Sequence, residues 1–590
     1  MHQYKAPIED IHFVLDSLDY SKHCQTIGAT EASDDMVEAI LEEAAKFCEQ
    51  VLAPLYQVGD QEGCQFDNGV VTTPTGFKAA YEQWVENGWP SLAQKEEFGG
   101  QGMPESLGNV INELGGSANW AWAMYSGLSH GAMNTLEMHG TDEQKEEYLT
   151  PLVSGQWTGT MCLTEPHCGT DLGLLKTKAT PQDDGSYSIE GTKIFISAGE
   201  HDLAENIVHI VIARMPDSPE GSKGISLFVV PKLLNGEANH VSCGSLEHKM
   251  GIHGNATCVM NFDGAKGFLI GPKNKGLNCM FTFMNFARLA TAVQGLSTME
   301  LAYQGSLAYA KDRRAMRAMT GTKSPDQPAD LIIEHADVRR MLLTQKAFAE
   351  GSRMLIYQLG MFVDIAKQEQ DSPEKTRADE FLGLLTPIAK AFVTEAGFEC
   401  ANLGMQVFGG HGYIKEWGME QIVRDSRIST LYEGTTGIQS LDLLGRKVLS
   451  NRGQVLKKYT KEMQSFCKQA KSIKEMKPFT NRLIKMSKEW GWMTLKIGLK
   501  ARKNRDEVNA ACVEYLMYSG YAVLAYMWAQ MAYKAMQALE DPNCENKQQY
   551  INKIQTCEFY YERLLPRTRG FKDCLLGGSK TLMQMSADDF

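Results

Sequence analysis

Apolar residues recur at helical spacing along the first part of the chain. In "SDDMVEAILEEAAKFCEQVLA" (33–53) they stand three or four positions apart, which gives a helix one apolar face. Ser33 or Asp34 can cap the start of this helix, and Pro54 ends it. The same spacing continues to about residue 155 and predicts a helical block.

The period then changes from that of a helix to that of a strand. The segments with strand character are short, rich in β-branched residues and bounded by Gly, Pro, Asp and Asn. They are 186–197, 206–215, 224–232 and 256–263. Because helical spacing returns at residue 281, we expect a small β domain between two helical blocks.

A chain of 590 residues is too long for a single core. The changes of period predict an α+β fold with several parts. These are an N-terminal extension (1–40), an N-terminal helical domain (41–155), a middle β domain (156–280), a C-terminal helical bundle (281–452) and an additional helical domain (453–590). The sequence has no strand followed by GxGxxG, so a dinucleotide-binding Rossmann unit is not expected.

The net charge of −13 is spread unevenly along the chain. Residues 451–590 hold 24 Lys and Arg against 14 Asp and Glu, a net of +10, which leaves a net of −23 for residues 1–450. This asymmetry favours two regions that attract each other, and the alternatives are a nucleic-acid or an anionic membrane surface.

The cysteines and the N-terminus bear on the cellular compartment. The 14 cysteines form no CxxC pair and no disulfide or zinc pattern, so we interpret them as reduced thiols. The first residues, "MHQYKAPIED", show no export signal. We therefore expect a cytoplasmic protein.

The stretch "TLYEGTTGIQSL" (430–441) places one acid, Glu433, between an aromatic residue and Gly-Thr-Thr-Gly. The simplest interpretation is a helix start. Thr435 or Thr436 would be the N-cap, and an acid near a helix N-terminus suits the helix dipole. This stretch alone does not say whether the acid also has a chemical role.

Several motifs occur in a fixed order along the chain. They are "MCLTEPHCGTD" (161–171), "IFISAGE" (194–200), "ARLATA" (287–292), "YAKDR" (309–313), "QVFGGHG" (406–412) and "LYEGTTGIQ" (431–439). With the order helical block, β domain, helical block, they resemble the acyl-CoA dehydrogenase family over roughly residues 40 to 450. The extra end segments resemble those of larger bacterial members. The resemblance implies a β-barrel-like middle domain and a C-terminal four-helix bundle.

The resemblance implies an FAD-dependent enzyme that converts a saturated acyl-CoA to the trans-2-enoyl-CoA in fatty-acid β-oxidation. In this family the acid of the Tyr-Glu-Gly motif is the catalytic base, which assigns that role to Glu433. The physical need agrees with it. Removing a proton α to a thioester requires a base close to that carbon and donors that stabilise charge on the carbonyl.

The resemblance also assigns the cofactor contacts residue by residue. The cofactor-binding positions are Met161, Leu163, Thr164, Gly169, Thr170, Phe195, Ile196, Ser197, Arg313, Gln406, Gly409, Gly410, Thr435, Thr436 and Ile438. Arg313 matches an arginine that reaches the FAD of a neighbouring subunit. Two positions depart from the family pattern, because Phe195 stands where Trp is usual and Gly437 where a member has Gln.

The substrate-binding positions implied by the resemblance are Thr170, Asn285, Arg288 and Gly434. Arg288 matches an arginine near the thioester and the base. Asn285 stands where several members have Asp, which changes the charge beside that arginine. His253 and His411 each lie beside glycines, and we interpret both as structural.

The resemblance implies electron-transfer flavoprotein as the acceptor of the electrons. An acyl-CoA oxidase that uses O₂ and a DNA-binding flavoprotein are the alternative functions. The thioether substrate 3-methylmercaptopropionyl-CoA, from the breakdown of dimethylsulfoniopropionate, is the alternative to an ordinary saturated acyl-CoA. We expect a homodimer in which 453–590 docks on its own bundle, and no nucleic acid. Peripheral membrane contact stays open.

Overall fold

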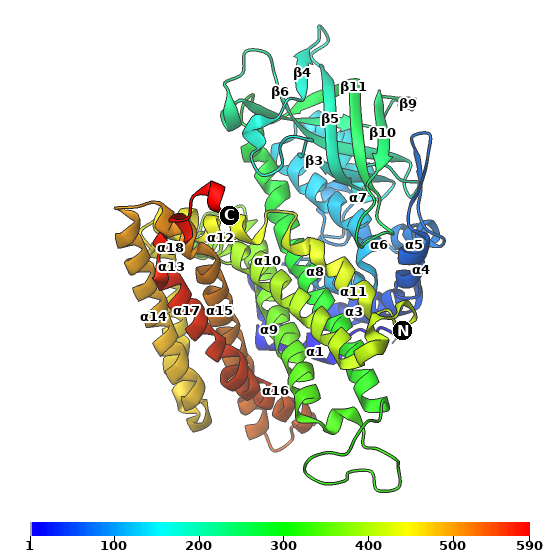
Figure 1. The fold of residues 1–590 in the computed structure, drawn as a ribbon. Helices are drawn as coiled ribbons and strands as arrows, with labels where there is room; N and C mark the ends of the chain where they lie inside the picture. Colours follow the sequence, from blue (N-terminus) through cyan, green and yellow to red (C-terminus); the bar gives the residue numbers. More distant parts are fainter. Residues whose placement is uncertain (1–2) are drawn as a thin grey trace. The chain divides into compact units, whose positions relative to one another are not determined.

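The computed structural model describes residues 3–590 and divides the chain into two compact units. One unit is residues 35–290, and the other combines residues 1–34 with 291–590. Each unit is described by itself below, with the element labels of Figure 1. These units are coarser than the domain boundaries expected from the sequence, which stay a prediction.

The unit of residues 35–290 begins with helices. The helix expected over 33–53 forms as α3 (Asp34–Phe47) and continues as a π-helix over Cys48–Leu52. Pro54 then stands at the start of α4 (Leu55–Glu62), where its missing N–H does no harm. After the hairpin of β1 (Gln65–Asp67) and β2 (Val70–Thr72) follow α5 (Phe77–Glu86), α6 (Glu105–His139) and α7 (Asp142–Val153).

A seven-stranded sheet follows the helices of this unit, and part of it closes on itself. The strands are β3 (Trp157–Cys162), β4 (Lys178–Pro181), β5 (Tyr187–Ser197), β6 (Asn206–Arg214), β7 (Ile225–Pro231), β10 (Val241–Leu246) and β11 (Thr257–Ile270). β11, β5, β4, β6 and β7 pair in a ring, because β7 bonds to both β6 and β11. A separate hairpin joins β8 (Leu233–Leu234) to β9 (Glu237–Ala238).

Side-chain patterning explains this sheet. β6 reads "NIVHIVIAR" and is buried from Asn206 to Ala213, as a strand covered on both faces must be. One of its faces joins a core with α6 and α7, and the other lies in a second core with β5 and β11. The strands expected at 186–197, 206–215 and 224–232 thus form as β5, β6 and β7.

The second unit is helical. Its elements include α1 (Ile8–Ser17), α2 (Tyr20–Ile27), the later part of α8 (Gly276–Asp312), α9 (Ala336–Ala366), α10 (Pro373–Phe408), α11 (Met419–Arg427) and α12 (Thr436–Leu441). The additional region contributes α13 (Gln454–Gln469), α14 (Lys477–Ala501), α15 (Asp506–Glu540), α16 (Lys547–Phe559), α17 (Thr568–Gly577) and α18 (Lys580–Met583).

The additional helical region docks on the bundle through α15, as the sequence predicts. α15 packs on α9, α10 and α12, and Figure 1 shows it beside α14 and α17 as well. The indole N–H of Trp528 donates to the carbonyl of Ala347 in α9 at 2.9 Å. Ion pairs such as Lys458–Glu380 (2.6 Å) and Arg567–Glu399 (2.9 Å) join the same two regions. Opposite charges of the two regions therefore meet in ion pairs where the regions pack together.

A cluster of six charges ties the start of the chain to its end. Asp10 of α1 pairs with Arg353 of α9 and with Lys553 of α16. Burial alone would raise the pKa of Asp10, but Lys553 and Arg353 lower it below its ordinary value. The cluster also contains Glu300, Lys346 and Glu350, so that three acids face three bases. A balanced cluster of this kind tolerates burial, whereas removing one member leaves a charge uncompensated.

Among residues 3–590, one helical segment, Pro373–Tyr413, is long and apolar enough to cross a membrane by length and composition. Of its most apolar window, 72% is buried in the fold, which is typical of a core helix.

Candidate active site

The turn that carries Glu433 has an unusual backbone. Glu433 has φ +54° and Gly434 has φ +88°, so two consecutive residues adopt the left-handed conformation. The φ of the second position favours glycine, and a Cβ there would lie 2.6 Å from the side-chain amide nitrogen of Gln439. A left-handed non-glycine residue is strained and persists where its surroundings hold it.

Two buried donors hold this turn from the inside. Lys390 of α10 donates from Nζ to the carbonyl of Gly434 at 2.6 Å. Gln439 of α12 donates from Nε2 to the carbonyl of Glu433 at 2.8 Å. Both donors are buried, so the two carbonyls of the turn face the protein interior.

Hydroxyl groups fix the flanks of the same turn. Tyr432 donates to Oε1 of Gln294 at 2.5 Å, and Thr436 donates to Oε1 of Glu395 at 2.5 Å. The Thr435 side chain accepts from the amide of Ile438 at 3.2 Å, which makes it the N-cap of α12. The expectation of a helix start is therefore confirmed at Thr435, and it coexists with the strained turn before it.

The end of α10 forms a second candidate contact area in the same unit. Gln406, Gly409 and Gly410 are exposed there, and a Cβ placed on either glycine would meet nothing within 4 Å. His411 closes this corner, since its Nδ1 lies 2.9 Å from the hydroxyl of Tyr309 and its ring stacks on Trp417. These contacts support the structural interpretation of His411.

Arg313 follows the end of α8 and is exposed. Its amide donates to the carbonyl of Tyr309 at 2.8 Å, and its own carbonyl accepts from Ile332 at 2.9 Å. The backbone is thus fixed on both sides while the side chain extends to the surface. This placement leaves the side chain available to a ligand or to another subunit.

In the unit of residues 35–290, the loop after β3 contains the predicted flavin contacts Leu163, Thr164, Gly169 and Thr170. Lys193 of β5 is buried and donates to the carbonyl of Leu163 at 3.1 Å and to Glu165 at 2.8 Å. Ile194 donates from its amide to the carbonyl of Thr164 at 2.8 Å. The loop is therefore held against β5 at three successive residues, with Gly169 and Thr170 exposed beyond them.

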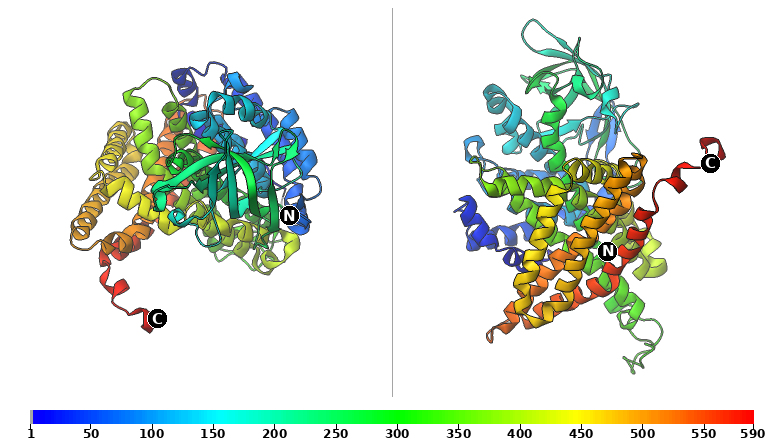
Figure 2. Two further views of the ribbon diagram at one scale, coloured as in Figure 1. Left: turned by 90° about the horizontal axis from the view of Figure 1, so that it is seen from above. Right: turned by 90° about the vertical axis from the view of Figure 1, so that its left-hand side faces the viewer.

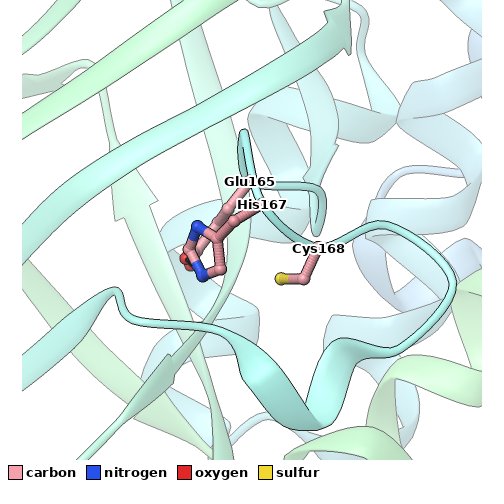
Figure 3. Close-up of side chains that lie close together, drawn as sticks. All are labelled: Glu165, His167 and Cys168. Atoms are coloured by element: carbon pink, nitrogen blue, oxygen red, sulfur yellow. Dashed lines mark ion pairs between the residues drawn. The ribbon is translucent and has the colours of Figure 1, made fainter.

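Glu165, His167 and Cys168 project from one turn of this loop, and their ligating atoms lie within 4.8 Å of one another (Figure 3). The carboxylate of Glu165 also accepts from the amides of residues 176 and 177 and from the hydroxyl of Thr177. Burial raises the pKa of Glu165, but Lys193 and these hydrogen bonds lower it overall. The group is best explained as an anchor of the loop, because Lys193 already neutralises its carboxylate.

Phe195 stands out in β5. Its φ is +60°, and the residue is 58% exposed, while the next residue, Ile196, is buried. The register with β11 shifts at this point, where Cys258 pairs with Ile196 but Met260 pairs with Lys193. Such a bulge re-aims a side chain. It turns the aromatic ring outward, and Ser197 follows at the end of the strand.

Two predicted substrate residues of this unit, Asn285 and Arg288, lie on α8. Nη1 of Arg288 donates to Oδ1 of Asn285 at 3.3 Å, and the guanidinium lies 6.0 Å from the ring centroid of Phe281. Asn285 therefore provides a neutral acceptor where an aspartate would provide a negative charge. The positive charge of Arg288 is not reduced by this contact.

The remaining lone histidine has a structural environment. Nδ1 of His253 lies 2.8 Å from a carboxylate oxygen of Asp60, and Nε2 lies 2.8 Å from the carbonyl of Lys249. Asp60 raises the pKa of His253 above its ordinary value. Because both ring nitrogens are engaged within the fold, the structural interpretation of His253 is supported.

The predicted residues thus form two sets. Glu433, Gly434, Thr435, Thr436 and Ile438 lie in one short segment of the helical unit, which also contains Arg313 and the α10 corner. Met161, Leu163, Thr164, Gly169, Thr170, Phe195, Ile196, Ser197, Asn285 and Arg288 lie in the other unit. Sequence reasoning missed Lys390 and Gln439. The signal for Lys390 was a lysine inside the apolar run "PIAKAFV", where a charge needs a specific partner.

The residues present fit a flavin on two observations. The ring of Phe195 is exposed at the end of a strand and offers an apolar face to a planar group. Gly409 and Gly410 leave open space where a Cβ would stand, which suits the close approach of a phosphate or sugar to backbone.

Four family models match the chain in succession. They are the acyl-CoA dehydrogenase N-terminal domain (34–156), the middle domain (160–265), the C-terminal domain (274–449) and an acetyl-CoA dehydrogenase C-terminal-like region (459–586).

Individual proteins show the same likeness. The chain is 46% identical to 3-methylmercaptopropionyl-CoA dehydrogenase of Ruegeria pomeroyi over 77% of this chain and 78% of that protein. It is 31% identical to a broad-specificity linear acyl-CoA dehydrogenase of Mycobacterium tuberculosis over the full length of both. Among solved structures, a chain from a study of the electron transferring flavoprotein of Acidaminococcus fermentans superposes with a TM-score of 0.58. It is 25% identical and covers 69% of this chain and 96% of its own.

Proposed function

Because the chain belongs to the acyl-CoA dehydrogenase family, we propose that Glu433 is its catalytic base. The chain is an FAD-dependent oxidoreductase that acts on CH–CH bonds of acyl-CoA thioesters. The observation that carries the proposal is the left-handed turn at Glu433 and Gly434, fixed from inside by Lys390 and Gln439.

The turn supplies position. A general base must be held close to the proton that it removes, and a turn with fixed carbonyls loses little freedom when substrate binds. Gly434 lets the thioester approach the backbone, because it has no side chain. We assign to the main-chain N–H of Glu433 a hydrogen bond to the thioester carbonyl, which stabilises the negative charge that develops there.

The proposed reaction removes two hydrogens from the substrate, one as a proton and one as a hydride. Glu433 takes the α-hydrogen as a proton, the β-hydrogen leaves as hydride, and a C=C bond forms between the two carbons. FAD, when bound, is the hydride acceptor.

The residues that would hold FAD come from several segments. They are the 161–170 loop, Phe195 with Ile196 and Ser197, Gln406 with Gly409 and Gly410, and Thr435 with Thr436 and Ile438. The open glycine backbone of the α10 corner suits a phosphate or a sugar, and Arg313 serves the FAD of a second subunit.

Arg288 adds a positive charge near the thioester in this proposal. Because Asn285 is neutral, that charge is stronger than it would be beside an aspartate. A cation near the carbonyl favours the enolate-like transition state.

Two substrate classes are supported, an ordinary saturated acyl-CoA of fatty-acid β-oxidation and 3-methylmercaptopropionyl-CoA. The first is favoured by the full-length likeness to a linear acyl-CoA dehydrogenase, and the second by the 46% identity to the thioether enzyme. A panel of acyl-CoA thioesters with an artificial electron acceptor decides between them. A ratio of kcat/KM above tenfold for the thioether substrate over butyryl-CoA would establish the second.

We propose that electron-transfer flavoprotein accepts the electrons. We also propose that this protein is a homodimer and that it works in the cytoplasm. The solved chain from the flavoprotein study supports the acceptor, and the free cysteines support a reducing compartment. Rapid reoxidation of the reduced enzyme by air in a stopped-flow instrument would point instead to an oxidase. We expect no nucleic-acid ligand, because Lys458, Lys553 and Arg567 of the additional region are used in ion pairs with the bundle.

The test is flavin reduction by substrate. Wild-type protein should be yellow and should bleach anaerobically when acyl-CoA is added. Glu433→Gln keeps the shape of the side chain but cannot accept the proton, so flavin reduction should slow by about 10²–10⁴-fold. The matched control is Glu558→Gln, an exposed acid of α16. A Glu433→Gln rate within tenfold of wild type, with FAD bound, would assign the base to another residue.

A further inference from the structure

The last described residues form an exposed arm, defined here as residues 578–590. After α17 the chain passes Gly578, forms the short helix α18 and ends in a turn over Ala587–Asp589. Leu582, Met583 and Met585 are 59%, 65% and 52% exposed. Three neighbouring apolar side chains in water are unfavourable unless another surface covers them.

The start of the arm is fixed. The Ser579 hydroxyl donates to Glu507 at 2.8 Å, and the side-chain amide of Asn504 donates to that hydroxyl at 3.0 Å. From this anchor the arm runs outward, and both views of Figure 2 show the red segment outside the outline of the neighbouring helices. The arm therefore leaves its own helices in a defined direction.

A groove lies at the same end of the additional helical region. It has a volume of about 590 Å³ and runs between α14 and the start of α13. Its apolar walls are Leu449, Leu456, Leu495 and Leu499, of which Leu495 is 62% exposed. Glycines 453, 491 and 498 also line it, and small residues let a second chain approach closely.

The rim of the groove is positively charged. Arg452, Lys457 and Arg502 line it together with no acidic residue. Within residues 3–590, none of these three cations takes part in an ion pair, whereas their neighbour Lys458 pairs with Glu380. The arm provides the matching charges, because Asp588 and Asp589 follow its apolar residues.

We propose that the arm of one copy of this chain lies in the groove of a second copy. Leu582, Met583 and Met585 cover the leucines of the groove, and the two aspartates meet the unpaired cations of its rim. The anchored, outward direction of the arm favours a second copy over its own groove. Exchange by both copies is symmetric and fills both grooves, which is the usual form of association between identical chains. The proposal is independent of the role assigned to Glu433.

The direct test is a disulfide between two different chains. In a Cys574→Ser background, which removes an exposed thiol, one tagged chain carries Leu499→Cys and a differently tagged chain carries Met583→Cys. The two are co-expressed and oxidised mildly. A cross-linked band that contains both tags is expected. Replacing Leu499→Cys by Gln548→Cys, at an exposed site on α16, is the control and should give no such band.

Other outcomes decide against the proposal. A cross-link that forms only when both cysteines are on one chain would place the arm in its own groove. The absence of a cross-link in either arrangement would show that the arm and the groove do not meet.

Mass in solution gives a second readout. Removing residues 580–590, or introducing Leu495→Asp, should halve the mass measured by light scattering at low micromolar concentration. Arg502→Glu should weaken association, and adding Asp588→Arg with Asp589→Arg should restore it. Circular dichroism in the far ultraviolet reports that the variants fold. An unchanged mass overturns the proposal, as does binding to anionic phospholipid vesicles that Leu495→Asp alone abolishes.

Discussion

Two loops carry nine of the nineteen predicted site residues, and they are held in different ways. The loop of residues 163–171 is tied by a buried ion pair, Glu165 with Lys193. The turn around Glu433 is tied by donors onto two backbone carbonyls. A carboxylate can take up a proton and lose its partner, whereas a backbone carbonyl has no such second state. The loop of residues 163–171 is therefore held by a contact that depends on pH. The turn around Glu433 is held through acceptors that do not depend on pH.

The largest expected effect is on the first loop. Glu165→Gln removes the charge that balances Lys193, which is fully buried. Breaking one side of a buried ion pair typically costs about 3–5 kcal/mol, and we expect a loss of that size in the free energy of unfolding by urea. The control is Glu190→Gln, at an exposed acid of β5, the strand that also carries Lys193. It should change the free energy of unfolding little. If Glu165→Gln and Lys193→Met together are no more stable than Glu165→Gln alone, the pair is not what holds the loop.

A smaller effect is expected on the second loop. Lys390→Met removes the donor to the Gly434 carbonyl, and an unsatisfied buried acceptor costs about 1–3 kcal/mol. Flavin reduction should also slow, because Glu433 is no longer held in place, while acyl-CoA affinity should change less. Stopped-flow absorbance at several substrate concentrations separates the rate of flavin reduction from the affinity for acyl-CoA. Lys468→Met, at an exposed lysine of α13, serves as the control, and equal behaviour of both variants would contradict this assignment.

The N-cap after the base should contribute less. Thr435→Ala loses the acceptor for the amide of Ile438 and should lower stability by about 1 kcal/mol. Thr435→Ser keeps the hydroxyl and should recover most of that loss. Thermal unfolding of the two variants side by side makes the comparison, and an equally large loss in both would mean that the methyl group matters instead.

Mild acid should have the smallest effect and should distinguish the loops. The pKa of Glu165 is lowered in the folded protein from the ordinary 4.5, so its contribution is present above that value and is lost as pH falls through the folded pKa. Hydrogen exchange should therefore show residues 163–171 opening before residues 431–436 as pH decreases. The reverse order would contradict the comparison.

The sequence predicted what depends on local pattern. The strands β5, β6 and β7 appear within one or two residues of the expected ranges, because alternation and turn residues are local signals. Thr435 was found as a cap for the same reason. The helix expected over 33–53 is confirmed, but the change to a π-helix in its last turn was not predicted, because residue periodicity does not distinguish the two.

Contacts distant in sequence were not predicted. Lys390 and Gly434 are 44 residues apart, and Glu165 and Lys193 are 28 apart, so neither pair leaves a trace in any short stretch. The left-handed conformation of Phe195 was also missed, because it follows from a register shift between two strands. The motifs located the chemistry, but what holds those residues in place comes from tertiary contacts.

The six-charge cluster affects when helix α1 can reach its final environment during synthesis of the chain. Asp10 and Lys553 are 543 residues apart, so a ribosome that adds about 5–20 residues per second takes roughly half a minute to two minutes to make the second after the first. During that interval Arg353 can meet Asp10, but the cluster is short of one positive charge. Helix α1 therefore reaches its final, neutral environment only when nearly the whole chain has been synthesised. A nascent chain stalled before residue 553 should still expose α1 to proteases.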